Sequence, residues 1–259
     1  MRDQHLGELL FSLMTMDVRN TARSVHFTLP ESVWEQEREF FASFGFSKVE
    51  KAGLQYRLFE EELFCRTPYS VVWDAVLEKL PKLDHIYQIG GYQVKPDVVL
   101  SLKPVYAQLI LTGRKTVEVR RRFNRKWAGK RAVLYASRPL GALIGEALIA
   151  DVVSGTPSAI WNEYGKAIGC SIREYENYVT GATEISALIL GEILPYISPI
   201  PLMQVSHLIK RDVRAPQSYC SVEDSNSWGK AVAIAAMLHG VSHRIQTDHE
   251  GTLSHGTNL

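Results

Sequence analysis

The sequence has few cysteines, almost no net charge and no long apolar run. Its 259 residues carry a formal charge of +1 and include three cysteines. Cys65, Cys170 and Cys220 lie far apart, and none belongs to a C-x-x-C pair. This pattern excludes a disulfide framework and a cysteine-rich zinc site, and it is typical of a reducing compartment. We therefore expect a cytoplasmic protein.

The sequence also offers neither a membrane-spanning segment nor a clear metal motif. No apolar stretch approaches the ~20 residues that a spanning helix needs. Asp3 and Glu8 flank the short apolar stretch near the N-terminus, which is unlike a signal peptide. His239 and His243 have the spacing of two metal ligands on a helix, but a third ligand is not evident beside them. We accordingly expect no membrane association, no metal and no cofactor.

The most informative stretch begins with a predicted helix. Pro104 suits a first helical turn, and Tyr106, Leu109 and Ile110 recur at the spacing of one helical face. Gly113 tolerates the left-handed conformation that ends many helices. We therefore expect a helix that stops at this glycine and leads directly into the next element.

The residues after this turn switch to a period of two, which predicts a strand. Val117 and Val119 lie on one face of it. The other face carries three polar side chains, those of Thr116, Glu118 and Arg120. A glycine turn that leads into a strand with one charged face is well suited to presenting cations to a ligand.

Two consecutive runs resemble the ASCH domain, a small β-barrel of the PUA superfamily. They are LKPVYAQLILTGRKTVEVRRR and VLYASRPLGALIGEALIADV. The G-x-K-T turn of that family corresponds to residues 113–116, and its next barrel strands correspond to residues 132–137 and 142–152. The family's apolar strand before a proline-rich segment is matched by ISALILGEILPYISPIPLMQV. The resemblance covers residues 97–220.

Positive charge is concentrated between Arg114 and Arg131. Nine basic residues less one acid, Glu118, give +8 there, whereas the whole chain carries +1. Phe123 and Trp127 lie among these cations. Proteins recognise single-stranded RNA with cations that contact its phosphates and aromatic rings that stack on its bases. A solvated basic loop with two core aromatics is the alternative. We expect RNA or a nucleotide as the partner, contacted by Lys103, Arg114, Glu118, Arg120, Arg121, Arg122, Arg125, Tyr135 and Ser137.

Three residues are candidates for catalysis. Lys115 and Thr116 occupy the G-x-K-T turn, where the lysine is a cation or, if desolvated, a base. The structural alternative is a turn lysine beside a threonine that caps backbone groups. Glu146 lies between apolar neighbours on a predicted strand, where its carboxylate either meets Lys115 or faces outward. Tyr135 and Ser137 are expected in the same cavity, with the core as the alternative for Tyr135.

The resemblance implies several activities. Some ASCH relatives hydrolyse acetylated cytidine with a lysine, a threonine and a glutamate, and a ribonuclease activity has been attributed to the family. Lys115 corresponds to that lysine, but Glu118 stands where the threonine would be. The alternatives are therefore RNA or nucleoside binding, a Lys115-dependent amidohydrolase on acylated cytidine, a ribonuclease that lacks a histidine partner for Lys115, and a non-catalytic regulatory protein.

Residues 1–66 are predicted to form an α/β unit. The expected elements are a helix, a strand (25–29), a second helix (30–41) and a hairpin (46–50 with 54–59). This order resembles the C-terminal half of a GNAT N-acetyltransferase, as does the run EFFASFGFSKVE within it. That family binds the coenzyme A pyrophosphate on a glycine-rich loop, but His5 occupies a glycine position here. We expect a remnant that serves a structural or homo-oligomer-forming role, with a residual acetyltransferase or a plain α/β unit as alternatives.

The expected fold is α+β and has four parts. An N-terminal α/β unit (1–66) precedes a helical linker (67–96), a PUA-like barrel of the ASCH type (97–220), and a helix from residue 228 to residue 243 followed by a disordered tail (221–259). Short helices over residues 158–164 and 172–179 are expected between barrel strands. Trp161, Tyr164, Tyr175 and Tyr178 either cover one end of the pocket or pack in the core.

Overall fold

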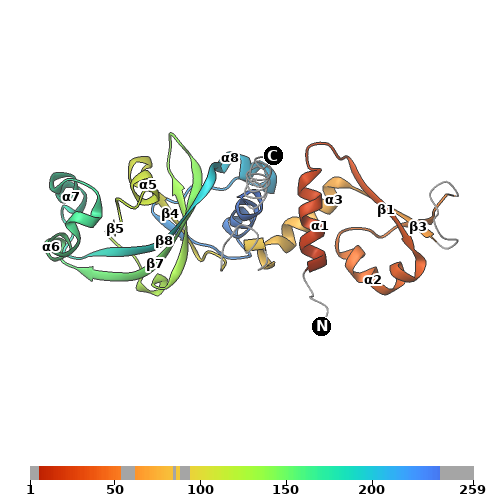
Figure 1. Cartoon of the computed structure of the whole chain (residues 1–259), viewed down its shortest axis with the longest axis horizontal. Coiled ribbons are helices and arrows are strands. Elements are labelled where there is room, and N and C mark those ends of the chain that lie inside the picture. The colour runs from red at the N-terminus through yellow and green to blue at the C-terminus, as the bar shows by residue number, and fades with distance from the viewer. Residues whose placement is uncertain (1–5, 54–61, 84–85, 88–93, 240–259) are drawn as a thin grey trace, which may run out of the picture. The chain divides into compact units, whose positions relative to one another are not determined.

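The structure is a computed structural model that describes residues 6–53, 62–83, 86–87 and 94–239. It divides into two compact units, Met1–Ile86 and Tyr87–Leu259 (Figure 1). The division falls inside the segment expected to be a linker, because helix α3 (Tyr69–Lys79) packs on the helices and strands of the first unit. Among the described residues, no helix has the length and apolar character that a membrane span requires.

The first unit contains a three-stranded sheet in the order β1-β3-β2, with both pairings antiparallel. Strand β3 therefore lies between two strands that α2 connects, which is a split β-α-β arrangement. The predicted strand 25–29 and helix 30–41 are confirmed. Residues 54–59 lie outside the described part of the chain, and β2 pairs with the later β3. The elements are α1 (Leu6–Asp17), β1 (Ser24–Pro30), α2 (Glu31–Ser43), β2 (Val49–Lys51), β3 (Glu62–Pro68), α3 and η2 (Leu80–Lys82).

Aromatic side chains fill the core of this unit. The ring of Phe11 lies 4.5 Å from that of Phe44, and the ring of Phe27 lies 4.8 Å from that of Phe46. Gly45 stands between the two buried phenylalanines with φ +88°, where a Cβ would collide with Val71. The F-x-x-x-G-F pattern therefore marks a turn that requires glycine.

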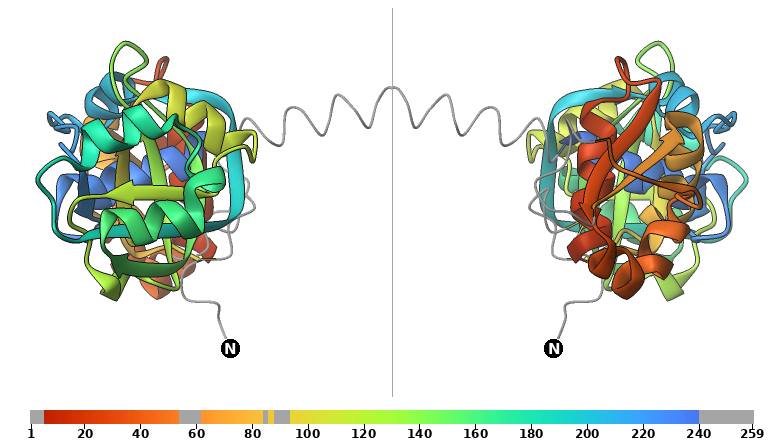
Figure 2. Two further views of the ribbon diagram at one scale, coloured as in Figure 1. Left: turned by 90° about the vertical axis from the view of Figure 1, so that its left-hand side faces the viewer. Right: turned by 90° about the vertical axis from the view of Figure 1, so that its right-hand side faces the viewer.

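The second unit is a six-stranded sheet in the order β5-β8-β7-β6-β4-β9 that curls into part of a barrel (Figures 1 and 2). Only the β4–β6 pairing is parallel among the described strands. The predicted α+β fold and barrel strands are confirmed. The elements are β4 (Val98–Leu102), α5 (Pro104–Leu111), β5 (Val117–Arg120), η3 (Arg125–Trp127), β6 (Lys130–Ala136), β7 (Ala142–Gly155), α6 (Pro157–Ile168), α7 (Ile172–Val179), β8 (Ile185–Pro201), α8 (Leu202–Ile209) and β9 (Tyr219–Ser221).

Two helical covers lie on this sheet. Helices α6 and α7, which interrupt the chain between β7 and β8 as expected, pack on Val117 and Val119 of β5. A helix over residues 227–239 packs on the outer face of the sheet, where the ring of Trp228 lies 6.5 Å from that of Tyr135. The prediction of a helix from residue 228 is confirmed as far as residue 239. The expected disordered tail after Thr247, and His243, lie outside the described residues.

Candidate nucleic-acid site

A cavity of about 670 Å³ opens beside β5 in the second unit. Its wall includes Tyr106 from α5, Glu118 and Arg120 from β5, and Tyr178 from α7. Ser218, just before β9, completes the opposite side. The cavity thus brings residues of the α5–β5 segment together with residues of α7 and of the segment before β9.

Strand alternation directs two charges into this cavity. Val117 and Val119 pack against α6 and α7, and the alternate Glu118 and Arg120 line the cavity, which Val119 also borders. The predicted alternation is confirmed for residues 117–120, but Thr116, expected on the polar face, precedes the strand and lies outside the cavity wall. Gly113 ends α5 with φ +71°, which allows the chain to turn sharply into the strand.

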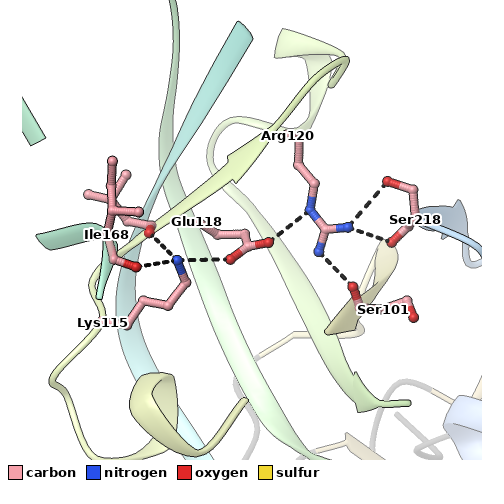
Figure 3. A network of polar contacts seen from close by, with 7 residues as sticks. Ser101, Lys115, Glu118, Arg120, Ile168 and Ser218 are labelled. Atoms are coloured by element: carbon pink, nitrogen blue, oxygen red, sulfur yellow. Dashed lines mark hydrogen bonds and ion pairs between the residues drawn. The ribbon is translucent and has the colours of Figure 1, made fainter. Parts of the chain in front are cut away.

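Lys115 forms part of the cavity floor, with only 3% of its surface exposed. Its Nζ donates to the carbonyl oxygens of Val117 at 2.8 Å and Ile168 at 2.6 Å, and it forms an ion pair with Oε2 of Glu118 at 3.1 Å (Figure 3). An ammonium has three N–H donors, and three acceptors surround this one. Lys115 therefore holds the start of β5 against the end of α6.

Arg120 continues the same network across the sheet. Its Nε lies 3.1 Å from Oε1 of Glu118, and its two terminal nitrogens reach the carbonyl oxygens of Ser101 at 2.7 Å and Ser218 at 3.2 Å (Figure 3). Its Nη1 also donates to Oγ of Ser218 at 3.2 Å. Ser101 belongs to β4, at the far side of the strand order from β5. One side chain thus connects the two edges of the curled sheet where no backbone ladder joins them in the described chain.

This network determines which charges a ligand meets. The donors of Lys115 and Arg120 are directed at protein oxygens, so a phosphate could bind them only by displacing those partners. Lys103, in contrast, is an exposed cation on the cavity rim. Burial is the main cause that raises the pKa of Tyr106 and of Tyr178, so both hydroxyls stay protonated donors at neutral pH.

Glu146 and Tyr135 lie elsewhere, on the outer face of the sheet below the helix over residues 227–239. Glu146 pairs with Val133 across the β6–β7 ladder, and its fully buried carboxylate accepts a hydrogen bond from the Tyr196 hydroxyl at 3.2 Å. Burial raises the pKa of Glu146 to about 8, although nearby Arg131 and the hydrogen bond lower it. The carboxylate partner of Lys115 is accordingly Glu118 and not Glu146.

The remaining predicted residues divide between rim and scaffold. Ser137 lines the cavity, whereas Thr116 and Arg114 are exposed and do not belong to its wall. Arg121 donates to the carbonyl oxygen of Tyr178 at 2.8 Å and so fixes the end of α7. With Arg122 it lines a second hollow of about 480 Å³.

The two aromatic residues of the basic run are core residues. Phe123 and Trp127 are each 9% exposed and pack inside the curled sheet, while Arg125 remains exposed beside them. They therefore offer no free ring to a base. Tyr178 lines the cavity and is 46% exposed, and Tyr175 borders the cavity from the core under α6 and α7. Trp161 and Tyr164 are partly buried against that core.

Sequence reasoning missed several cavity residues. Ser101 and Ser218 are brought to Arg120 over separations of 19 and 98 residues, which no local pattern signals. Cys170 and Glu174 also line the cavity. The capping box of Ser171 and Glu174 could have been read from the S-x-x-E spacing that starts α7.

The comparisons with known proteins concern the second unit. Residues 100–236, or 137 of 259 residues, match the model of the ASCH domain. An "ASCH domain-containing ribonuclease" of Zymomonas mobilis subsp. mobilis is 35% identical over 124 residues, which are 48% of this chain and 82% of that protein. A crystal structure of ASCH from Zymomonas mobilis is 32% identical, with a TM-score of 0.48, and covers 53% of this chain and 94% of its own. These matches do not support the acetyltransferase resemblance of the N-terminal unit.

Proposed function

The chain belongs to the ASCH domain family, and we propose that it binds single-stranded RNA with one nucleotide held in the cavity beside β5. The cavity carries this proposal. At about 670 Å³ it lies within the ~300–1,000 Å³ range typical of small-ligand sites, and tyrosines from α5 and α7 line it. Single-stranded RNA is bound by proteins that receive an unstacked base in such a site.

The floor of the cavity suits the polar edge of a base. The network of Lys115, Glu118 and Arg120 is held in place before a ligand arrives, so little side-chain entropy is lost on binding. The hydroxyls of Tyr106 and Tyr178 are donors, and the carboxylate of Glu118 is an acceptor. A base offers both kinds of partner along its edge.

Phosphate contacts in this proposal come from exposed cations. Lys103 lies on the rim, and Arg122 and Arg125 are exposed on the basic run. This differs from the expected contact through Arg120, whose donors already reach Ser101 and Ser218. Because each phosphate contact releases counterions that had condensed on the RNA, binding should weaken as salt rises.

A ribonuclease activity is the second candidate, and the name of the Zymomonas relative, a ribonuclease, favours it. Cleavage through the ribose 2′-hydroxyl needs one group to take a proton and another to give one. Burial raises the pKa of Tyr106, so its hydroxyl is the group that gives a proton, and the Glu118 carboxylate in the same cavity is the group that takes the proton of the 2′-hydroxyl. Tyr106→Phe should then abolish cleavage of a fluorogenic RNA while RNA binding persists.

The geometry favours binding over an amidohydrolase that uses Lys115 as a base. To accept a proton, Lys115 would have to lose one and release the oxygens of Val117 and Ile168 and the carboxylate of Glu118. A residual acetyltransferase and a homo-oligomer formed by the N-terminal unit stay predictions. Hydrolysis of an acylated cytidine by the wild type, measured by product release, would restore the amidohydrolase.

Fluorescence anisotropy with a labelled single-stranded RNA tests the proposal. Tyr178→Ala should weaken binding on the order of tenfold because ring and hydroxyl are both lost, and Tyr178→Phe, which loses only the hydroxyl, should weaken it less. Lys103→Ala should weaken binding and reduce its salt dependence, whereas Lys166→Ala, an exposed lysine on α6 outside the cavity, should do neither. A wild type that does not bind RNA at low salt would refute the proposal.

A further inference from the structure

The sheet of the N-terminal unit has one covered face and one open face. Leu29 of β1 and Cys65 of β3 are buried under the helices. The alternate residues His26, Thr28 and Arg66 are exposed on the other face. This open face is hollowed to about 460 Å³, and the hollow is lined by Ser24, His26, Phe27, Thr28, Phe64 and Arg66.

Strand register brings the hollow's rings together. His26 pairs with Arg66 and Thr28 pairs with Phe64 across the antiparallel β1–β3 ladder. The imidazole of His26 and the ring of Phe64 are diagonal neighbours, with centroids 5.9 Å apart and planes inclined by 38°. Two rings on adjacent strands thus form a platform with a guanidinium beside it.

The charges of this hollow are available to a ligand. Among the described residues, Arg66 makes no hydrogen bond or ion pair, in contrast to Arg120 in the cavity of the second unit. The lining contains one cation and no carboxylate. Glu50 of β2 pairs with Phe64 from the side away from β1, outside the lining. The complementary ligand is therefore flat at one end and anionic at the other.

We propose that this open face is a second nucleotide-binding site, which takes one nucleotide of single-stranded RNA. The base stacks on Phe64 and His26, the phosphate pairs with the Arg66 guanidinium, and the hydroxyls of Ser24 and Thr28 lie within the same hollow. Proteins that bind single-stranded nucleic acid on a sheet surface do so with aromatic rings on neighbouring strands, which stack on the bases, and with cations, which contact the phosphates. The site is independent of the cavity beside β5, because its residues all belong to the first unit.

Photo-crosslinking of the full chain tests this site directly. A single-stranded RNA that carries 5-iodouridine is irradiated with the protein, and the modified peptides are identified by mass spectrometry. The expected adduct lies in the peptide that contains Phe64 or in the one that contains His26. Adducts confined to residues 97–239, or no adduct anywhere, would overturn the proposal.

Matched variants separate stacking, charge and folding. Phe64→Ala and Arg66→Ala should each weaken the N-terminal crosslink on the order of tenfold, while Phe64→Tyr and Arg66→Lys retain most of it. Arg38→Ala, which removes an exposed arginine from α2, should change nothing. Thermal unfolding of each variant excludes misfolding as the cause.

Tyr178→Ala should leave this crosslink intact, so failure of the cavity and failure of this site are distinguishable. Equal crosslinking by Phe64→Ala and Phe64→Tyr would refute a stacking platform.

Discussion

The two faces of the curled sheet each bury an ionic cluster, and the clusters are built differently. On the cavity side, Lys115 has three oxygen partners and Glu118 lies between two cations. On the outer side, Oε2 of Glu146 and two nitrogens of Arg131 have no hydrogen-bond partner among the described residues, whereas the cavity-side cluster has one such atom, Nε of Arg120, which still lies 3.1 Å from the Glu118 carboxylate. A matched cluster fixes geometry, whereas an unmatched one makes stability depend on pH, since the buried group avoids its charged form.

The largest effect should come from breaking the matched cluster. Lys115→Met removes the cation, leaves the carbonyl oxygens of Val117 and Ile168 without their donor, and leaves the buried Glu118 with Arg120 as its one remaining cation. We expect a loss of about 3–5 kcal/mol in the free energy of unfolding, because one partner of a buried pair has been deleted. Urea denaturation measures it, with Lys166→Met on exposed α6 as the control. A loss no larger than that of the control would show that the cluster contributes little.

The unmatched cluster should instead give a pH dependence. Burial raises the pKa of Glu146 from 4.5 to about 8 in the folded protein. Between these values the unfolded chain has released the proton and the folded chain has kept it, so stability falls as pH rises. Glu146→Gln, which stays neutral, should remove a slope that amounts to a few kcal/mol over this window. Urea midpoints measured from pH 5 to pH 8 test this, and parallel curves for both proteins would contradict it.

The contrast also shows how far the sequence predicts the site. Alternation over residues 117–120 is local, so it correctly placed Glu118 and Arg120 on one face. The helix over residues 227–239, about 100 residues later in the chain, covers the outer face of β6 and β7. The burial of Glu146 on that face could therefore not be inferred from its sequence neighbours. The burial of Phe123 and Trp127 was likewise set by the curl of the sheet and not by the basic residues around them.

A smaller effect should follow from the hydrogen bond that Glu146 does have. Tyr196→Phe removes the hydroxyl that donates to Oε1 at 3.2 Å. We expect a loss of about 1 kcal/mol, typical of one hydrogen bond, measured by urea denaturation at pH 5. The pKa of Glu146 should also rise further, because that bond lowers it. Tyr164→Phe, on the other side of the sheet, is the matched control, and equal losses in the two variants would contradict a specific role for the Tyr196 hydroxyl.

The smallest effect should come from the outer end of the unmatched cluster. Glu192 is half exposed, with 49% of its side chain accessible, and its Oε2 lies 2.6 Å from Nη2 of buried Arg131. Glutamine keeps an acceptor oxygen for Nη2 of Arg131, and water screens the charge that is lost, so Glu192→Gln should cost under about 1 kcal/mol at pH 5. The change should nonetheless be visible in the pH profile, because Arg131 without its carboxylate lowers the pKa of Glu146 more strongly. Stability should then stop falling at a lower pH than in the wild type, whereas the exposed Glu184→Gln should leave the profile unchanged. An unshifted profile for Glu192→Gln would mean that the charge of Arg131 does not reach Glu146, and the two groups would then have to be treated as separate buried charges.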